Sequence, residues 1–189
     1  MRVGVTKRVS RKSDTPFDGS FVGWANPRNE DPGSGDYCFA FDVPDYLRFR
    51  ELGLPSIVEA GVAAFAESIE CYPSPEAYDQ AHAGGVKFAS QCYIPSGMMT
   101  PDGDRIEPPE SHAIFVAHVR HAQLKRNDFT GVPYYWAQVD ALDFRVDVVI
   151  DPSIVTTPPR SGGVMSGSFW LSGRIREAAR WVTPAYRTM

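Results

Sequence analysis

Cysteine is scarce in this chain, and long apolar runs are absent. Three cysteines occur in 189 residues, and no two of them form a C-x-x-C pair, which argues against a disulfide scaffold and against a zinc site. We interpret Cys38, Cys71 and Cys92 as reduced core residues. There is no run of about 18 apolar residues, and MRVGVTKRVSRKSD at the start lacks the apolar core of a signal peptide. These absences predict a cytoplasmic protein without membrane contact.

The motifs of several common enzyme classes are also missing. G-x-x-x-x-G-K-[ST], G-x-G-x-x-G and G-x-S-x-G do not occur, so no phosphate cradle or nucleophile elbow is recognisable. His118 and His121 fall on opposite faces of a predicted strand, and His112 lies about 20 Å from His118 along it, so neither pair closes on one metal. We predict no cofactor and no metal, and no catalytic residue is identified.

Acidic residues outnumber basic ones, and they gather in the middle of the chain. The net charge is −4, and residues 31–110 hold fourteen acidic side chains against four basic ones. A general nucleic-acid-binding protein is instead expected to be basic. The acidic middle suits a basic partner, so one alternative is an acidic inhibitor or an immunity-type protein.

Glycine and proline are abundant, with 16 of each, and they divide the sequence into short β-type runs. The first part of the chain contains three such runs, at residues 1–9, 20–25 and 37–43. The part from residue 86 onward contains five, which are KFASQCYI, HAIFVAHVRHAQL, YYWAQVDAL, FRVDVVI and GVMSGSFWLSG. Five strands with one proline-rich loop at 97–111 predict a small antiparallel barrel or a strongly bent sheet, which resembles the OB fold in architecture.

Two helices are predicted in the first half. Ser56 and Glu59 have the spacing of a capping box, and the apolar residues that follow are separated alternately by four and three positions, as in an amphipathic helix. Pro73 ends this helix, and Ser-Pro at 74–75 begins a shorter one that the glycines at 84–85 end. The fold class is therefore predicted as α+β, with both helices packed against the sheet. The apolar stripe of the first helix consists of Val58, Val62, Phe65, Ile69 and Tyr72.

The chain is predicted to form a single domain over residues 1–189, because no linker is long enough to force a boundary and no internal repeat is visible. Strands and helices occupy residues 1–85 of this domain. The barrel-like half follows in residues 86–175, and a short tail in residues 176–189.

Period-two alternation assigns the side chains of the last strands to two faces. In GVMSGSFWLSG it places Phe169 and Leu171 inside, and the glycines mark bends or close approaches of the backbone. In the two preceding runs it leaves aromatic residues and an arginine outside, where Asp147 is expected to pair with the arginine. Exposed rings beside an arginine provide a stacking surface, unless the helix predicted at 56–72 covers them. The candidate ligand-binding residues are Tyr134, Trp136, Arg145 and Trp170.

These patterns predict a soluble intracellular binding or interaction protein that uses the sheet surface and the adjacent loops. Its partner is an unknown protein or small molecule. One alternative is single-stranded nucleic-acid binding through the same four residues, with Lys125 and Arg126 as further contacts. Another is an enzyme whose site is assembled from distant loops that include Glu107, Glu110 and His112.

Overall fold

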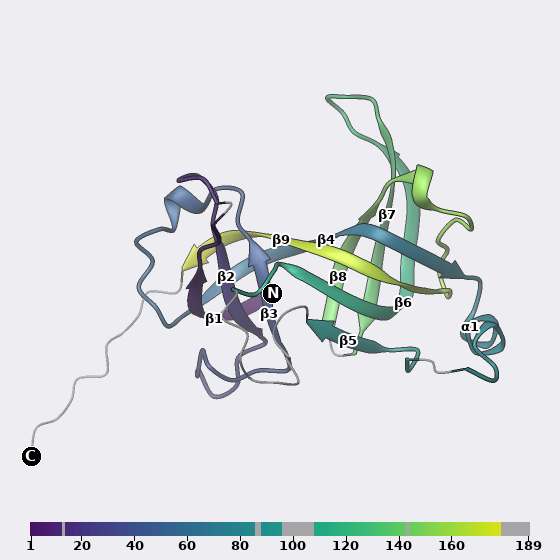
Figure 1. Ribbon diagram of the computed structural model, residues 1–189, viewed down its shortest axis with the longest axis horizontal. Helices are drawn as coiled ribbons and strands as arrows, with labels where there is room; N and C mark the ends of the chain where they lie inside the picture. The colour runs from purple at the N-terminus through teal and green to yellow at the C-terminus, as the bar shows by residue number, and fades with distance from the viewer. Residues whose placement is uncertain (13, 86–87, 96–107, 143, 179–189) are drawn as a thin grey trace, which may run out of the picture.

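Strands make up most of the structure (Figure 1). The computed structural model describes residues 1–12, 14–85, 88–95, 108–142 and 144–178. Within these ranges the chain forms nine strands, one α-helix and two 3-10 helices. In chain order they are β1 (Arg2–Val9), β2 (Ser20–Ala25), β3 (Cys38–Asp42), η1 (Tyr46–Arg48), β4 (Ser56–Tyr72), α1 (Pro75–Ala81), β5 (Cys92–Pro95), β6 (His112–Arg126), β7 (Pro133–Ala141), β8 (Phe144–Ile150), η2 (Pro152–Ile154) and β9 (Val164–Ala178).

All nine strands belong to one sheet, in which hydrogen-bonded neighbours follow the order β1-β2-β3-β9-β4-β8-β7-β6-β5. Two additional pairings, of β1 with β4 and of β6 with β9, close this order into two rings. One ring consists of β1, β2, β3, β9 and β4, and the other of β4, β8, β7, β6 and β9. Both rings contain the antiparallel β4–β9 ladder, which extends from Val58 opposite Ala178 to Tyr72 opposite Val164. This ladder therefore joins the two halves of the molecule.

The helix predicted at residues 56–72 is wrong, because this segment is the 17-residue strand β4. It pairs with β9 along nearly its whole length, and β1 and β8 pair with parts of it. Ala64 faces the core, and so does Ile69 five positions later, because a bulge between Ala66 and Ser68 changes which residues point inward. The apolar spacing of three and four arises because inward residues such as Val62 and Ile69 alternate with Phe65, an apolar residue on the outer face, and this mixture has the spacing of a helix. Two features favour the strand over the helix: this segment forms long-range hydrogen bonds with β9, and it contains β-branched residues, which prefer strands.

The predicted fold class, α+β with an OB-like antiparallel barrel, is also wrong. Strands do occur in all five runs after residue 86, but β4 lies between β8 and β9 in the sheet, and β5 is a four-residue edge strand. Parallel pairings of β4 with β8 and of β3 with β9 make the sheet mixed. The physical reason is the length of β4 and β9, which each serve both rings and so tie the N-terminal strands to the C-terminal ones.

The short helix predicted after Pro73 is confirmed as α1, which spans Pro75–Ala81. Its N-cap is Ser74, whose Oγ accepts a hydrogen bond of 3.2 Å from the backbone N–H of Ala77. Tyr78 is buried in a small apolar cluster with residues of β6 and β9, so α1 is attached at one end of the sheet (Figure 1). Within the described ranges, no helix combines the length and the hydrophobicity that a membrane crossing requires.

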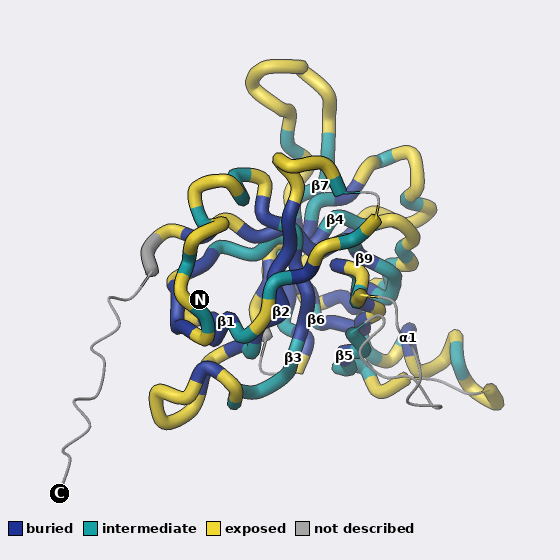
Figure 2. Tube along the Cα trace, turned by 60° about the vertical axis from the view of Figure 1, so that its left-hand side comes forward, coloured by how far each residue is buried: buried dark blue, intermediate teal, exposed yellow. Residues whose placement is uncertain are grey.

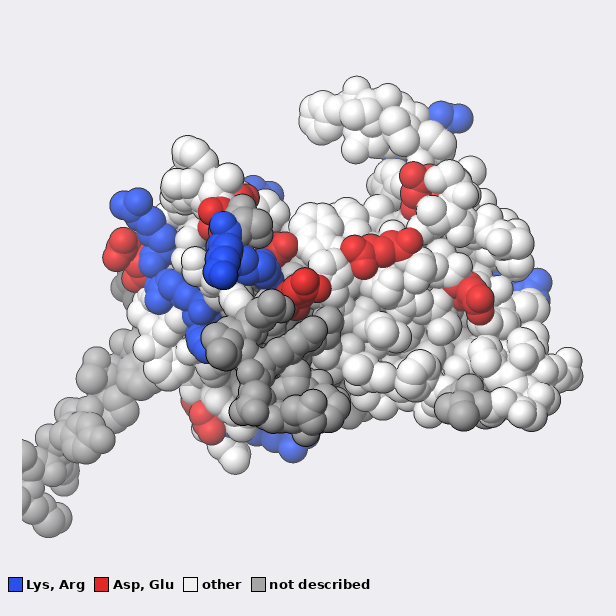
Figure 3. All heavy atoms as spheres, viewed as in Figure 1, with Lys and Arg blue, Asp and Glu red and all other residues white. Residues whose placement is uncertain are grey.

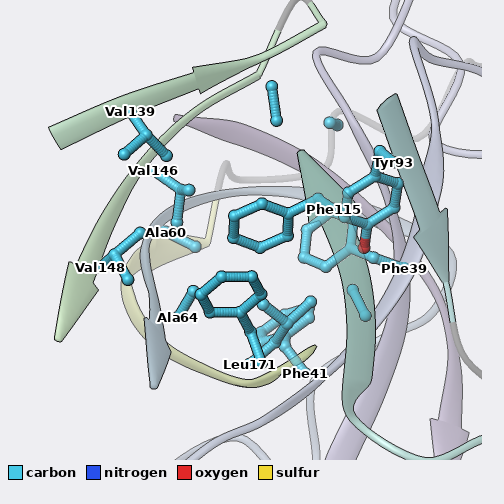
Figure 4. Packing of buried hydrophobic residues seen from close by; sticks show 14 of the residues in the cluster. Phe39, Phe41, Ala60, Ala64, Tyr93, Phe115, Val139, Val146, Val148 and Leu171 are labelled. Atoms are coloured by element: carbon cyan, nitrogen blue, oxygen red, sulfur yellow. The ribbon is translucent and has the colours of Figure 1, made fainter. Parts of the chain in front are cut away.

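The main hydrophobic core lies inside the rings (Figure 4), and buried stretches of chain run through the centre of the molecule (Figure 2). Phe169 and Leu171 of β9 are fully buried, as the alternation predicts. The ring of Phe169 stacks on that of Phe115, with centroids 3.8 Å apart and an interplanar angle of 7°. Phe39 and Phe41 of β3 belong to the same cluster. One group of aromatic rings therefore connects the N-terminal and C-terminal strands.

Gly167 is required where β9 passes β4. A Cβ atom at this position would lie 2.0 Å from the backbone oxygen of Ser68, so the two strands would have to move apart. We expect Gly167→Ala to lower the free energy of unfolding by about 3 kcal/mol, as measured by urea unfolding. Gly53→Ala is the matched control, because a Cβ there meets nothing within 4 Å and should change stability by less than about 0.5 kcal/mol. Equal stability of the two variants would contradict this view of the β4–β9 contact.

Candidate ligand-binding site

The carboxylate of Asp42, at the end of β3, is the centre of a polar cluster between the two rings of strands. Its Oδ1 accepts hydrogen bonds from the hydroxyls of Ser20 (2.5 Å) and Ser111 (2.6 Å) and from Nη1 of Arg11 (3.1 Å). Its Oδ2 accepts a hydrogen bond of 2.7 Å from the indole N–H of Trp170. One carboxylate thus holds together β2, β3, β9 and the chain that leads into β6.

Arg11 makes further hydrogen bonds within this cluster. Its Nη1 also donates to Ser20 Oγ at 2.7 Å, and its Nη2 donates to Ser111 Oγ at 2.9 Å and to the backbone oxygen of Pro109 at 3.0 Å. Both terminal nitrogens are therefore used within the protein, and the ion pair with Asp42 balances the guanidinium charge. Arg11 is consequently a structural partner of Asp42 rather than a free anion receptor.

The environment keeps Asp42 ionised. Burial alone would raise the pKa of its carboxyl group, but the hydrogen bonds from Ser111, Ser20 and Trp170 and the charge of Arg11 together outweigh burial, and the pKa is lowered. Asp18, on the loop between β1 and β2, also has a lowered pKa, because the backbone N–H and the hydroxyl of Thr15 donate hydrogen bonds to it. Both groups therefore carry negative charge at neutral pH.

A pocket of about 290 Å³ opens beside this cluster. Its lining includes three acidic residues, which are Asp14, Asp18 and Asp42. Among the described lining residues, Arg11 is the one basic residue. Phe17, whose residue surface is 69% exposed, and Trp170 contribute aromatic rings to the wall. Because Arg11 and Asp42 balance each other, the pocket has a negative excess next to two aromatic rings. Carboxylates and aromatic faces are the groups that recognise ammonium and guanidinium ions.

Charged side chains are unevenly distributed over the molecule as well. On the face seen in Figure 3, Lys, Arg, Asp and Glu gather over the half that contains β1, β2 and β3. The half that contains α1 and β5 shows mostly uncharged surface in the same view. The Asp42 pocket thus belongs to the charged half of the molecule.

Trp170, one of the predicted site residues, links the pocket to the outer surface of the sheet. Its indole N–H binds Asp42, and its ring packs against Phe65 of β4 with centroids 5.1 Å apart. Phe65 was not predicted as a site residue, because its segment was assigned to the apolar face of a helix. If residues 56–72 are treated as a strand, alternation places the Phe65 ring on the outer face, because the preceding residue, Ala64, faces the core.

Trp136 and Tyr134 of β7 lie on the same outer surface. Strand register places Trp136 opposite Val149 of β8, Val149 opposite Phe65 of β4, and Phe65 opposite Trp170 of β9, so the two tryptophans occupy one row across four strands. Both tryptophans are half-buried, and a strand rather than a helix neighbours them. Tyr134 lines a groove of about 490 Å³ with Phe65 and Val149.

The two basic residues predicted as nucleic-acid contacts are engaged within the protein. The ammonium of Lys125 lies 4.0 Å from the ring centroid of Trp136, which is a cation–π contact. Nη1 of Arg126 donates to the backbone oxygen of Gly131 at 3.0 Å. Both residues are on the hairpin formed by β6 and β7, at the end of the surface that carries Tyr134.

Arg145, the fourth predicted site residue, does not join the aromatic row. It is four residues from Val149 along β8, which corresponds to about 13 Å. Its Nε donates to Oδ1 of Asp140 at 3.0 Å, and Arg120 binds the other oxygen of the same carboxylate. The expected partner, Asp147, is not the residue that Arg145 binds, because the β7–β8 register brings Asp140 directly opposite Arg145.

The residues named for an enzyme alternative are only partly described. Glu107 lies outside the described residues, as do the rest of the predicted 97–111 loop up to residue 107 and the predicted tail from residue 179. His112 Nε2 is 2.9 Å from Glu67 Oε1, and His112 Nδ1 is 3.7 Å from Glu110 Oε2. In the part of the chain that the structure covers, no three or more His, Cys, Asp or Glu side chains are grouped to hold a metal ion.

The Asp42 pocket therefore presents carboxylates and aromatic rings to a bound group. Ser20 and Ser111 each donate to Asp42 and accept from Arg11, and the lowered pKa of Asp42 makes this carboxylate a weak base toward either hydroxyl. Comparisons of the chain with protein-family models, with curated proteins and with solved structures found no match.

Proposed function

We propose that this is a binding protein whose pocket beside Asp42 and Trp170 holds an ammonium or guanidinium group. The observation that carries the proposal is the combination of an acidic excess with two aromatic rings in a pocket of about 290 Å³. A lysine or arginine side chain of a partner protein and a small organic cation both carry this chemistry. The two carboxyl groups that provide the excess, Asp14 and Asp18, lie outside the acidic segment at residues 31–110.

The structure supports a cation rather than an anion as the ligand. An anion would have to approach Asp14 and Asp18, while the terminal nitrogens of Arg11 already donate to Ser20, Ser111 and Pro109 and its Nε is buried. A cation needs no such rearrangement. It can contact the carboxyl groups at the pocket wall and the exposed ring of Phe17 at the same time.

Isothermal titration calorimetry with matched cationic and neutral ligands tests the proposal. We expect N-acetyl-arginine amide or N-acetyl-lysine amide to bind, and binding to weaken as the salt concentration rises. N-acetyl-citrulline amide, which has nearly the shape of the arginine derivative without its charge, should not bind. Binding of the citrulline compound as tightly as the arginine compound would contradict the proposal, and so would quenching of tryptophan fluorescence by oligonucleotides alone.

A substitution in the pocket wall distinguishes binding of the cation in the pocket from its attraction by the net negative charge of the protein. We expect Asp18→Asn to weaken the binding of the arginine derivative about fivefold, because the variant removes one exposed carboxylate from the pocket wall while Asp14 and Asp42 remain. Glu76→Gln in α1 removes the same charge outside the pocket, and its affinity should equal that of the wild type. If both variants lost the same affinity, the ligand would be held by net charge and not by the pocket.

Comparing free ligands with peptides decides between the two sources of the cation. A short peptide with one arginine between neutral residues should bind more tightly than N-acetyl-arginine amide if the natural partner is a protein, because the peptide also covers the surface around Phe17 and Pro44. Equal affinity of peptide and amide supports a small organic cation. This comparison identifies only the source of the cation. The charge requirement of the pocket is tested by the arginine and citrulline derivatives.

A further inference from the structure

The β6–β7 hairpin projects from the body of the molecule and carries apolar residues at its end. Figure 1 shows it as the long ribbon pair that stands away from the rest of the sheet, and Figure 2 shows its end as exposed. Phe129, at the tip, is 99% exposed, and Leu124 and Val132 beside it are also exposed. A phenyl ring held completely in solvent is unfavourable to the isolated molecule.

Hydrogen bonds give the hairpin tip a defined shape. Asn127 Oδ1 accepts from the backbone N–H of Phe129 (2.9 Å) and of Thr130 (3.0 Å). The backbone of Asn127 bonds to Val132 and Gly131, with distances of 2.9 and 2.8 Å. Phe129 is therefore displayed by an ordered turn, and little conformational freedom is lost when its ring contacts a partner.

A groove that fits an aromatic ring lies directly beside this tip. It has a volume of about 490 Å³ and is formed where the hairpin approaches β4 and β8. Its apolar walls come from both of these strands and from the hairpin itself, whereas Phe129 is not part of the lining and points into solvent. The lining residues are Phe65, Asn127, Thr130, Val132, Tyr134 and Val149.

We propose that two copies of this chain associate through their hairpins, with Phe129 of each copy entering the groove of the other. The projecting ring and the groove lie next to each other on the same hairpin, so a two-fold axis through that region brings each ring to the other copy's groove. The tip also carries charges of opposite sign, because Arg126, whose Nη1 donates to Gly131, and Asp128 are both exposed. In a two-fold contact, Arg126 of one copy faces Asp128 of the other.

The proposed dimer contact uses different residues from the Asp42 pocket. A result that contradicts one proposal therefore leaves the other unaffected. None of the residues that line the pocket also lines the groove. Trp170 packs on the side of Phe65, and its fluorescence is expected to respond when an aromatic ring enters the groove. Binding of a cation does not require the dimer.

Sedimentation equilibrium of the full chain over a range of concentrations tests the proposal. We expect a reversible monomer–dimer equilibrium, and we expect Phe129→Ser to weaken it at least thirtyfold. Because Phe129 is wholly exposed, this variant should keep the wild-type unfolding temperature at concentrations where the protein is monomeric. Phe88→Ser is the control, since Phe88 is another exposed phenylalanine outside the hairpin and should leave the equilibrium unchanged.

A charge exchange tests the reciprocal geometry. Arg126→Asp and Asp128→Arg should each weaken dimer formation, because each variant brings like charges together across the two-fold axis, and the double variant should restore it. A double variant that is weaker than both single variants would overturn the proposal. A wild-type protein that stays monomeric up to about 0.5 mM, or one that grows into open-ended assemblies instead of closing at two copies, would overturn it as well.

Discussion

Phe169→Ala should lower the free energy of unfolding by about 3 to 5 kcal/mol, the largest loss that we expect from a single substitution in this protein. Phe169 is fully buried, and its ring stacks on Phe115 at 3.8 Å. Since β9 pairs with β4 and β6 at this level, the strands cannot close over the space that the ring leaves. The measurement is equilibrium unfolding in urea at a protein concentration low enough to keep the chain monomeric.

A residue on the neighbouring strand provides the control for this prediction. Ile114 of β6 is opposite Ser168, next to Phe169 in register, but its side chain points outward and is exposed. We expect Ile114→Ala to cost no more than about 1 kcal/mol, which is the range of strand propensities. If both variants cost the same, the aromatic stack would not be the main contact between β6 and β9.

Asp42→Asn should lower the free energy of unfolding by about 2 to 4 kcal/mol at neutral pH, because the carboxylate accepts several hydrogen bonds, one of them from a charged group. An asparagine side chain offers one oxygen and one NH₂ group. With the oxygen toward Ser20, Ser111 and Arg11, the NH₂ group faces the indole N–H of Trp170, so two donors oppose each other. The reverse orientation leaves three donors without their acceptor. Urea unfolding of the two proteins side by side measures the difference.

The pH dependence of that difference provides a second measurement. The pKa of Asp42 is lower in the folded protein than in the unfolded chain, where an aspartate titrates near about 3.9. Its contribution to stability is therefore complete above that value and is lost as the pH falls through the folded pKa. We expect the stabilities of the wild type and of Asp42→Asn to converge below about pH 4.

Another aspartate provides the control for the Asp42 variant. Asp147 of β8 is exposed and lies away from the cluster, and Asp147→Asn should change stability by less than about 0.5 kcal/mol. A difference between wild type and Asp42→Asn that stayed constant down to pH 3 would show that the charge of Asp42 is not what holds the cluster together.

Local alternation predicted the inward and outward sides of the C-terminal strands. Phe169 and Leu171 are buried, and Arg145 is exposed, as period-two patterning requires. These assignments succeed because the pleat of a strand is a property of consecutive residues. The same reasoning failed for residues 56–72, because both faces of β4 carry apolar residues, with Phe65 on the outer face, and because the bulge between Ala66 and Ser68 breaks the alternation.

The candidate site was only partly visible in the sequence. Trp170 was recognised as an aromatic residue on an outward face, but Asp42 was included only as part of the strand predicted at 37–43, and its partners are far away along the chain. Trp170 is 128 positions from Asp42, and Ser111 is 69 positions from it. No local spacing indicates such a cluster, since its members meet only after β3, β9 and the chain before β6 have come together.

By itself, the sequence determined where most strands begin and end, which of their side chains face the core, and that Ser74 and Pro75 start a helix, because each of these depends on neighbouring residues. Tertiary structure alone decided that β4 is a strand, that β4 and β9 join two rings, and that Asp42 meets Arg11, Ser20, Ser111 and Trp170. Those outcomes depend on hydrogen bonds and burial between distant segments, whose free energy is gained only when the whole sheet has formed.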